Sequence, residues 1–107
     1  MKRPSDIYTE DELRVIKSVM KMCTRDDLIF PQWEFSILTG VKICEAEEVI
    51  ESWPEVDLAD EGVLLTIRGI LGNLIGYPHG RGDYLYSKTS LDAEDFRMLK
   101  ERLDIIS

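Results

Sequence analysis

Carboxylates are the chemically distinctive side chains of this sequence, because eight of them fall within residues 43–62 and no lysine or arginine interrupts them. They are Glu45, Glu47, Glu48, Glu51, Glu55, Asp57, Asp60 and Glu61. The chain has 21 acidic and 13 basic residues, so this segment accounts for its whole net charge of −8. A gathered charge of this sign attracts basic surfaces and repels nucleic acid. The segment therefore predicts a basic protein as the class of partner.

Catalytic or metal-binding patterns are absent from the sequence. The single histidine, His79, would need Ser87 or Cys23 beside it to form a nucleophile–base pair, and no spacing predicts that. Cys23 and Cys44 lie in no CxxC motif and near no histidine cluster, so we expect two reduced, buried thiols. We predict a protein that is not an enzyme and has no cofactor or metal site.

Aromatic residues gather in the segment 77–84, where Tyr77, Arg81 and Tyr84 alternate with glycines. Aromatic and arginine side chains are enriched at binding hot spots, and loops on rigid scaffolds often carry function. We expect Tyr77 and Tyr84 to act as anchors beside the acids. The alternative is a turn with structural tyrosines.

The length and composition predict one domain, residues 1–107, with a real core. The apolar fraction of 44% is typical of globular proteins. No apolar run reaches the roughly 18 residues that a membrane span needs. The basic residues near the N-terminus precede no apolar segment, so we expect no signal peptide and a cytoplasmic location. The oligomeric state is not predicted.

A strong helix start lies at Thr9, because Thr9 and Glu12 have the spacing of a capping box. Tyr8 and Leu13 occupy the two positions of a hydrophobic staple. Apolar residues then recur at helical spacing, which predicts a helix over 9–23.

A pair of helices is predicted over 31–53. The first, 31–39, has Pro31 as its first residue, and Gly40 ends it as a left-handed cap would. Its apolar residues are Trp33, Phe35, Ile37 and Leu38. The second, 43–53, is amphipathic, with its glutamates opposite an apolar arc. That arc consists of Ala46, Val49, Ile50 and Trp53.

The segment 60–77 fits either a helix or a buried strand over 63–67 that begins a β-hairpin wing. We favour the helix, because the apolar pattern does not alternate. Gly62, Gly69 and Gly72 each cost a helix about 1 kcal/mol relative to alanine. Such glycines would permit close packing against a neighbouring helix.

The segment 77–90 is predicted as a loop with a short strand at 84–86, and the last helix opens near Ser90 or Asp92. The fold class is therefore all-α, with about five short helices.

Residues 32–51 resemble the helix-turn-helix superfamily in the spacing of apolar, small and glycine positions. The matching residues are Gln32, Phe35, Ser36, Gly40, Val41, Ala46 and Val49. A helical hairpin with a glycine cap is the alternative. In that family the second helix enters the major groove, where lysine and arginine supply the binding energy. This helix would instead present glutamates, with Lys42 as the one base nearby, so we do not expect DNA binding.

The chain also resembles the bacterial immunity proteins that neutralise nuclease toxins. Those of the colicin DNase type cover the toxin with an acidic helix and a Tyr-Tyr-Pro segment. This chain has the acids of 45–55 and the sequence Leu-Ile-Gly-Tyr-Pro at 74–78, where Gly76 replaces the first tyrosine. Its start, residues 5–10, is also similar. The resemblance implies a cytoplasmic antitoxin that binds a basic toxin domain.

The sequence thus predicts a protein–protein interaction module, and we expect six residues to bind the partner. They are Glu45, Glu48, Glu51, Glu55, Tyr77 and Tyr84. The alternative for the acids is a merely solvated surface. The alternative function is a helix-turn-helix transcriptional regulator of the winged-helix type, or a DNA-mimic protein.

Overall fold

The computed structural model describes residues 2–25, 31–76, 80 and 82–106, and within these residues all regular structure is helical. A 3₁₀ turn, η1 (Pro4–Asp6), precedes the α-helices. These are α1 (Glu10–Arg25), α2 (Gln32–Thr39), α3 (Ile43–Ser52), α4 (Glu61–Gly76), α5 (Gly82–Thr89) and α6 (Ala93–Ile106). The predicted all-α class is confirmed, with six α-helices described where about five were expected.

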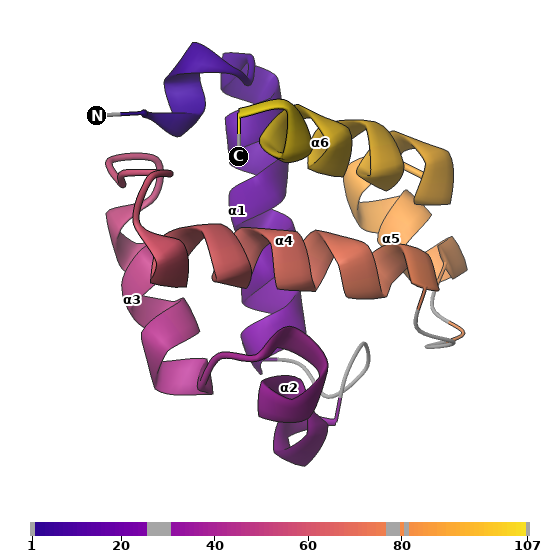
Figure 1. The fold of residues 1–107 in the computed structure, drawn as a ribbon. Coiled ribbons are helices and arrows are strands. Elements are labelled where there is room, and N and C mark those ends of the chain that lie inside the picture. Colours follow the sequence, from indigo (N-terminus) through magenta and orange to yellow (C-terminus); the bar gives the residue numbers. More distant parts are fainter. Residues whose placement is uncertain (1, 26–30, 77–79, 81, 107) are drawn as a thin grey trace.

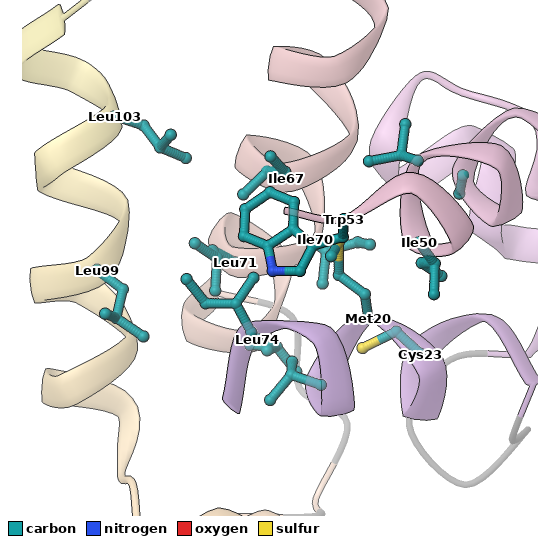
Figure 2. Close-up of a cluster of buried hydrophobic side chains, with 14 of the residues drawn as sticks. Met20, Cys23, Ile50, Trp53, Ile67, Ile70, Leu71, Leu74, Leu99 and Leu103 are labelled. Atoms are coloured by element: carbon teal, nitrogen blue, oxygen red, sulfur yellow. The ribbon is translucent and has the colours of Figure 1, made fainter. Parts of the chain in front are cut away.

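Helix α4 lies at the centre of the fold and crosses α1 (Figure 1). It packs against α6, α2 and α3. The core draws fully buried side chains from these helices: Ile16, Phe35, Ile50, Ile67 and Leu103. Figure 2 shows apolar side chains of α4 facing Leu99 and Leu103 of α6 and Met20 of α1. In the described part of the chain, no helix combines the length and apolar character needed to cross a membrane.

The start of α1 confirms the predicted capping box. The Thr9 amide donates to Glu12 Oε1 at 2.8 Å, and the Glu12 amide donates to Thr9 Oγ1 at 3.2 Å. Tyr8 and Leu13 are both buried, as the staple requires. These contacts satisfy two amides that the first helical turn leaves without backbone partners.

The segment predicted as helix or strand is the helix α4, so the β-hairpin wing is wrong. Asp60 caps it, because the Val63 amide donates to Asp60 Oδ1 at 3.2 Å. Of the three glycines, Gly69 lies directly against the backbone of Thr39 at the end of α2. Gly72 meets only the flexible side chain of Lys100. The burial of Ile67, Ile70, Leu71 and Leu74 in the core offsets the helix-propensity cost of these glycines.

The predicted loop with a strand at 84–86 is wrong where the structure describes it, because 82–89 form α5. Three alternating residues, Tyr-Leu-Tyr, are too short a pattern to distinguish the two conformations. In α5 Leu85 faces the core, and the Thr89 hydroxyl donates to the Leu85 carbonyl at 2.7 Å, one helical turn away. Ser90, with φ of 62°, ends the helix.

The pair α2 and α3 is joined by three residues, and Gly40 adopts the predicted left-handed conformation with φ of 80°. Its amide donates to the Ser36 carbonyl at 2.9 Å. Pro31 is the N-cap of α2 rather than its first helical residue. Most motif positions are buried: Phe35, Val41, Ala46 and Val49. Ser36 is exposed.

Candidate functional site

The outward face of α3 carries three of the predicted partner-binding residues. Glu45, Glu48 and Glu51 are exposed, and they succeed one another at intervals of three residues along the helix. The opposite face supplies Ala46, Val49 and Ile50 to the core. Helical spacing therefore separates the acids from the apolar residues as the sequence predicts, and the structure brings these three carboxylates onto one surface.

A groove of about 290 Å³ lies between α3 and the start of α4. Three carboxylates line it, and three valine side chains that are more buried form its apolar part. The carboxylates are Glu45, Glu48 and Asp60, and the valines are Val49, Val56 and Val63. A lysine or arginine has the same two parts, an apolar stem and a cationic head. The groove is therefore chemically suited to a basic side chain of a partner.

The end of the acidic run is engaged by the chain's own N-terminus. Arg3 Nη1 lies 3.2 Å from Glu55 Oε2. The Lys2 amide donates to Asp57 Oδ1 at 3.2 Å, and the Leu58 amide donates to the Lys2 carbonyl at 2.7 Å. Hydrogen bonds from the amides of Ala59 and Lys2 hold the pKa of Asp57 below its usual value. Glu55 and Asp57 thus have intramolecular roles.

The acids of α3 are not neutralised in this way. Within residues 2–25, 31–76, 80 and 82–106, no lysine or arginine side chain forms an ion pair with Glu48 or Glu51. Glu45 accepts a long backbone hydrogen bond, 3.4 Å, from the Lys42 amide. The negative field of α3 is therefore directed to solvent.

Tyr84, one of the two predicted tyrosine anchors, does not join this surface. Tyr84 lies on α5, half-buried, with Lys88 Nζ 5.8 Å from its ring centroid. Helix α3 precedes the start of α4 and α5 follows its end, so the length of α4, about 24 Å, separates them (Figure 1). Tyr77, like His79, lies outside the described residues.

Two exposed apolar residues were not recognised from the sequence as part of a surface. Trp33 and Ile37 on α2 are 74% and 77% exposed. They lie one helical turn apart, opposite the buried Phe35 and Thr39. That spacing is visible in the sequence, but the run of apolar residues conceals which side of α2 faces the core.

The two thiols differ, which corrects the expectation that both are buried. Cys23 is buried in the core, and this burial raises the pKa of its thiol. Cys44 is exposed on α3, because the inward arc of that helix is already occupied by Ala46, Val49 and Ile50. Both are free, and no cluster of three potential metal ligands occurs among the described residues.

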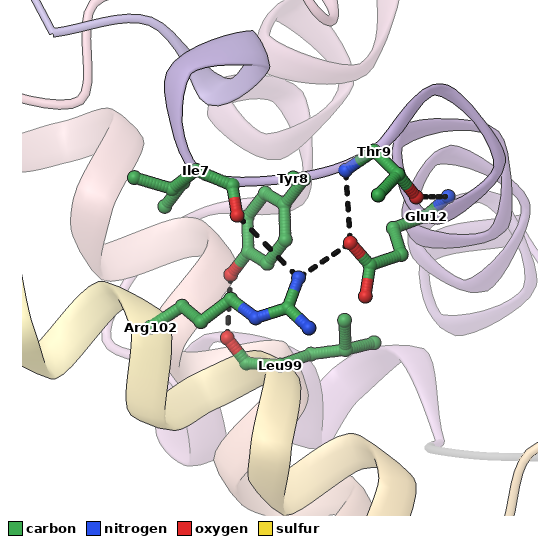
Figure 3. A network of polar contacts seen from close by, with 6 residues as sticks. All are labelled: Ile7, Tyr8, Thr9, Glu12, Leu99 and Arg102. Carbon is green, nitrogen blue, oxygen red and sulfur yellow. Dashed lines mark hydrogen bonds and ion pairs between the residues drawn. The ribbon is translucent and has the colours of Figure 1, made fainter.

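A separate polar network ties the N-terminal region to α6 and has a structural role (Figure 3). Arg102 forms an ion pair with Glu12, and its guanidinium lies 5.6 Å from the Tyr8 ring centroid. The Tyr8 hydroxyl donates to the Leu99 carbonyl at 2.5 Å. Burial raises the pKa of Tyr8, so this hydroxyl stays protonated and remains a donor.

The arrangement on α3 can recognise charge, because it presents carboxylates beside a groove that valine side chains line in part. Recognition of this kind needs no bond making or proton transfer. Comparisons of the chain with protein-family models, with curated proteins and with solved structures gave no match.

Proposed function

We propose that this protein docks a basic protein through the outward face of α3. The observation that carries the proposal is the exposure of Glu45, Glu48 and Glu51 beside a groove, where no basic side chain of the described residues pairs with Glu48 or Glu51. Like charges at this spacing cost the helix a few tenths of a kcal/mol per pair. The same unneutralised negative charge attracts a cationic partner at long range and so accelerates association with it.

The most concrete form of this function is neutralisation of a nuclease-type toxin. A nuclease binds phosphates through basic side chains, and an acidic helix of this kind would occupy the same surface. The resemblance of the acidic segment to immunity proteins supports this form. In the complex with such a toxin, the glutamates of α3 would occupy the sites on the nuclease where nucleic-acid phosphates bind.

The spacing of residues 32–51 and the left-handed turn at Gly40 support a second candidate, a regulator of helix-turn-helix type. The glutamates of α3 argue against contact with duplex DNA, since they would repel its phosphates. We expect no measurable binding of mixed-sequence duplex DNA in a fluorescence-polarisation titration at physiological salt. Sub-micromolar affinity with a steep salt dependence would instead support the regulator.

A charge-reversal experiment tests the proposal. The double variant Glu48→Lys/Glu51→Lys is compared with Glu10→Lys/Glu101→Lys, which changes the net charge equally at exposed positions of α1 and α6. The probe is a fluorescent lysine-rich peptide. We expect the α3 variant to lose about tenfold or more in affinity, mainly through the association rate, and the control to lose much less.

Circular dichroism establishes that both variants are folded. Equal losses in the two variants would mean that the peptide responds only to net charge. The acids of α3 would then be a solvated surface and the proposed function would be wrong.

A further inference from the structure

The apolar pair on α2 is exposed as a consequence of how α2 is held. Its inner side lies on α4, where Thr39 contacts Gly69 and the Asn73 side chain donates to the Leu38 carbonyl at 2.8 Å. Phe35 is fully buried on the same side. This attachment turns Trp33 and Ile37 outward, and an indole that is 74% exposed leaves a large apolar surface in water.

Helix α2, which carries the exposed pair, adjoins the acidic helix α3. Only residues 40–42 separate α2 from α3, and the two helices are in contact. Helix α2 and the start of α3 lie at the bottom of the view in Figure 1, away from the chain termini. Gly40 and Lys42 in the connection are exposed, as is Cys44 at the start of α3, and Glu48 follows Cys44 one turn later on the same face. The molecule thus presents exposed apolar side chains and exposed glutamates on two adjoining helices.

We propose that Trp33 and Ile37 are the apolar anchor of the docking surface whose charged part is α3. The occupant is a basic protein surface that places apolar side chains beside its cations. This inference rests on the proposed function and adds the residues that hold the partner after encounter. Tryptophan is among the commonest hot-spot residues, whereas solvent-exposed charges act chiefly on the association rate.

Charge complementarity selects this occupant over a second copy of the chain. Two copies that met through α2 would bring their α3 helices, with three exposed glutamates each, towards one another. The net charge of −8 on each copy opposes the same approach. A cationic partner with apolar side chains, in contrast, would be attracted by the glutamates of α3 and would bury Trp33 and Ile37 of α2.

The test uses two synthetic peptides of equal charge. One is an amphipathic helical peptide of lysine and leucine, and the other replaces each leucine with alanine. We expect the leucine peptide to bind the wild-type protein about tenfold more tightly or better, and Trp33→Ala to remove most of that advantage by raising the dissociation rate. The matched control is Ile105→Ala on α6, whose side chain is 83% exposed, and it should bind as the wild type does.

Tryptophan fluorescence provides an independent measurement. The emission of Trp33 should shift to shorter wavelength when the leucine peptide covers it, and Trp33→Phe should abolish the shift. Trp53 should contribute little to it, because it is buried at 4% exposure.

The outcomes separate the two proposals. If Glu48→Lys/Glu51→Lys weakens both peptides while Trp33→Ala binds the leucine peptide as the wild type does, the anchor is wrong and the charged face stands. If neither peptide responds to the charge reversal, the proposed function fails. If sedimentation shows that the wild type dimerises and Trp33→Ala is a monomer, the occupant is a second copy and the anchor for a basic partner is overturned.

Discussion

Gly69 of α4 touches the backbone of Thr39 at the end of α2. A Cβ atom added at Gly69 would stand 2.9 Å from the Thr39 carbonyl oxygen and 3.0 Å from its Cα. The neighbouring Asn73 donates to the carbonyls of Leu38 and Gly69, at 2.8 and 2.7 Å. This contact fixes α2 on α4 and so decides which side chains of α2 face outward.

Gly69→Ala should destabilise the protein by about 1–2 kcal/mol, although alanine favours a helix over glycine by about 1 kcal/mol. The reason is that the new methyl group meets backbone atoms of Thr39, which cannot move independently. Gly72→Ala is the matched control, because its Cβ would meet only the flexible side chain of Lys100, with Cε at 3.4 Å. Urea unfolding should show the control to be as stable as the wild type or more so. Equal stabilisation by both substitutions would contradict the contact.

Trp53→Ala should cost about 3–5 kcal/mol, because a large buried side chain is lost. The Trp53 indole Nε1 also donates to the Leu13 carbonyl at 2.9 Å. Trp33→Ala, in contrast, should change stability by less than about 0.5 kcal/mol, since that side chain is exposed. Thermal unfolding followed by circular dichroism compares the two. Similar losses would mean that the burial of one tryptophan is misassigned.

The thiols should differ in reactivity by orders of magnitude. Cys44 is exposed and should react with a thiol reagent at once in the native protein. Cys23 is buried with a raised pKa and should react only when the protein opens. Titration should therefore give one fast equivalent in buffer and two in denaturant. A protein that gives none in denaturant without reductant would instead contain a disulfide.

Glu12→Gln should produce a stability loss that depends on pH. The hydrogen bond from Arg102 holds the pKa of Glu12 below its usual value. Because the pKa of Glu12 is lower in the folded than in the unfolded protein, its ionised carboxylate stabilises the fold at pH values above the unfolded pKa of about 4.3. This stabilisation is lost as the pH falls through the folded pKa. The variant should thus lose about 1 kcal/mol at pH 7, a modest value because the pair is partly exposed, and less at pH 3.

Glutamine at this position still permits the capping contact with Thr9, so the comparison isolates the charge. Urea unfolding of wild type and variant at both pH values gives the measurement. A loss of the same size at pH 7 and pH 3 would show that the charge of Glu12 contributes nothing.

Features that depend on neighbours a few residues apart were determined by the sequence. The capping box of Thr9 and Glu12 was predicted atom by atom, because both partners lie within one helical turn. The gathering of Glu45, Glu48 and Glu51 on one face of α3 follows in the same way from helical spacing. The charged part of the candidate site was therefore readable before the fold was known.

Tertiary packing decided the rest of the candidate site. Arg3 neutralises Glu55 across 52 positions of sequence, which no local pattern indicates. Tyr84 lies on a helix remote from α3, because α4 separates them. The run of apolar residues in α2 permits either face to be buried, and contact with Gly69 on α4 selects the one that leaves Trp33 in solvent. Burial depends on which distant helix packs against a side chain, and that relation is established only when the chain folds.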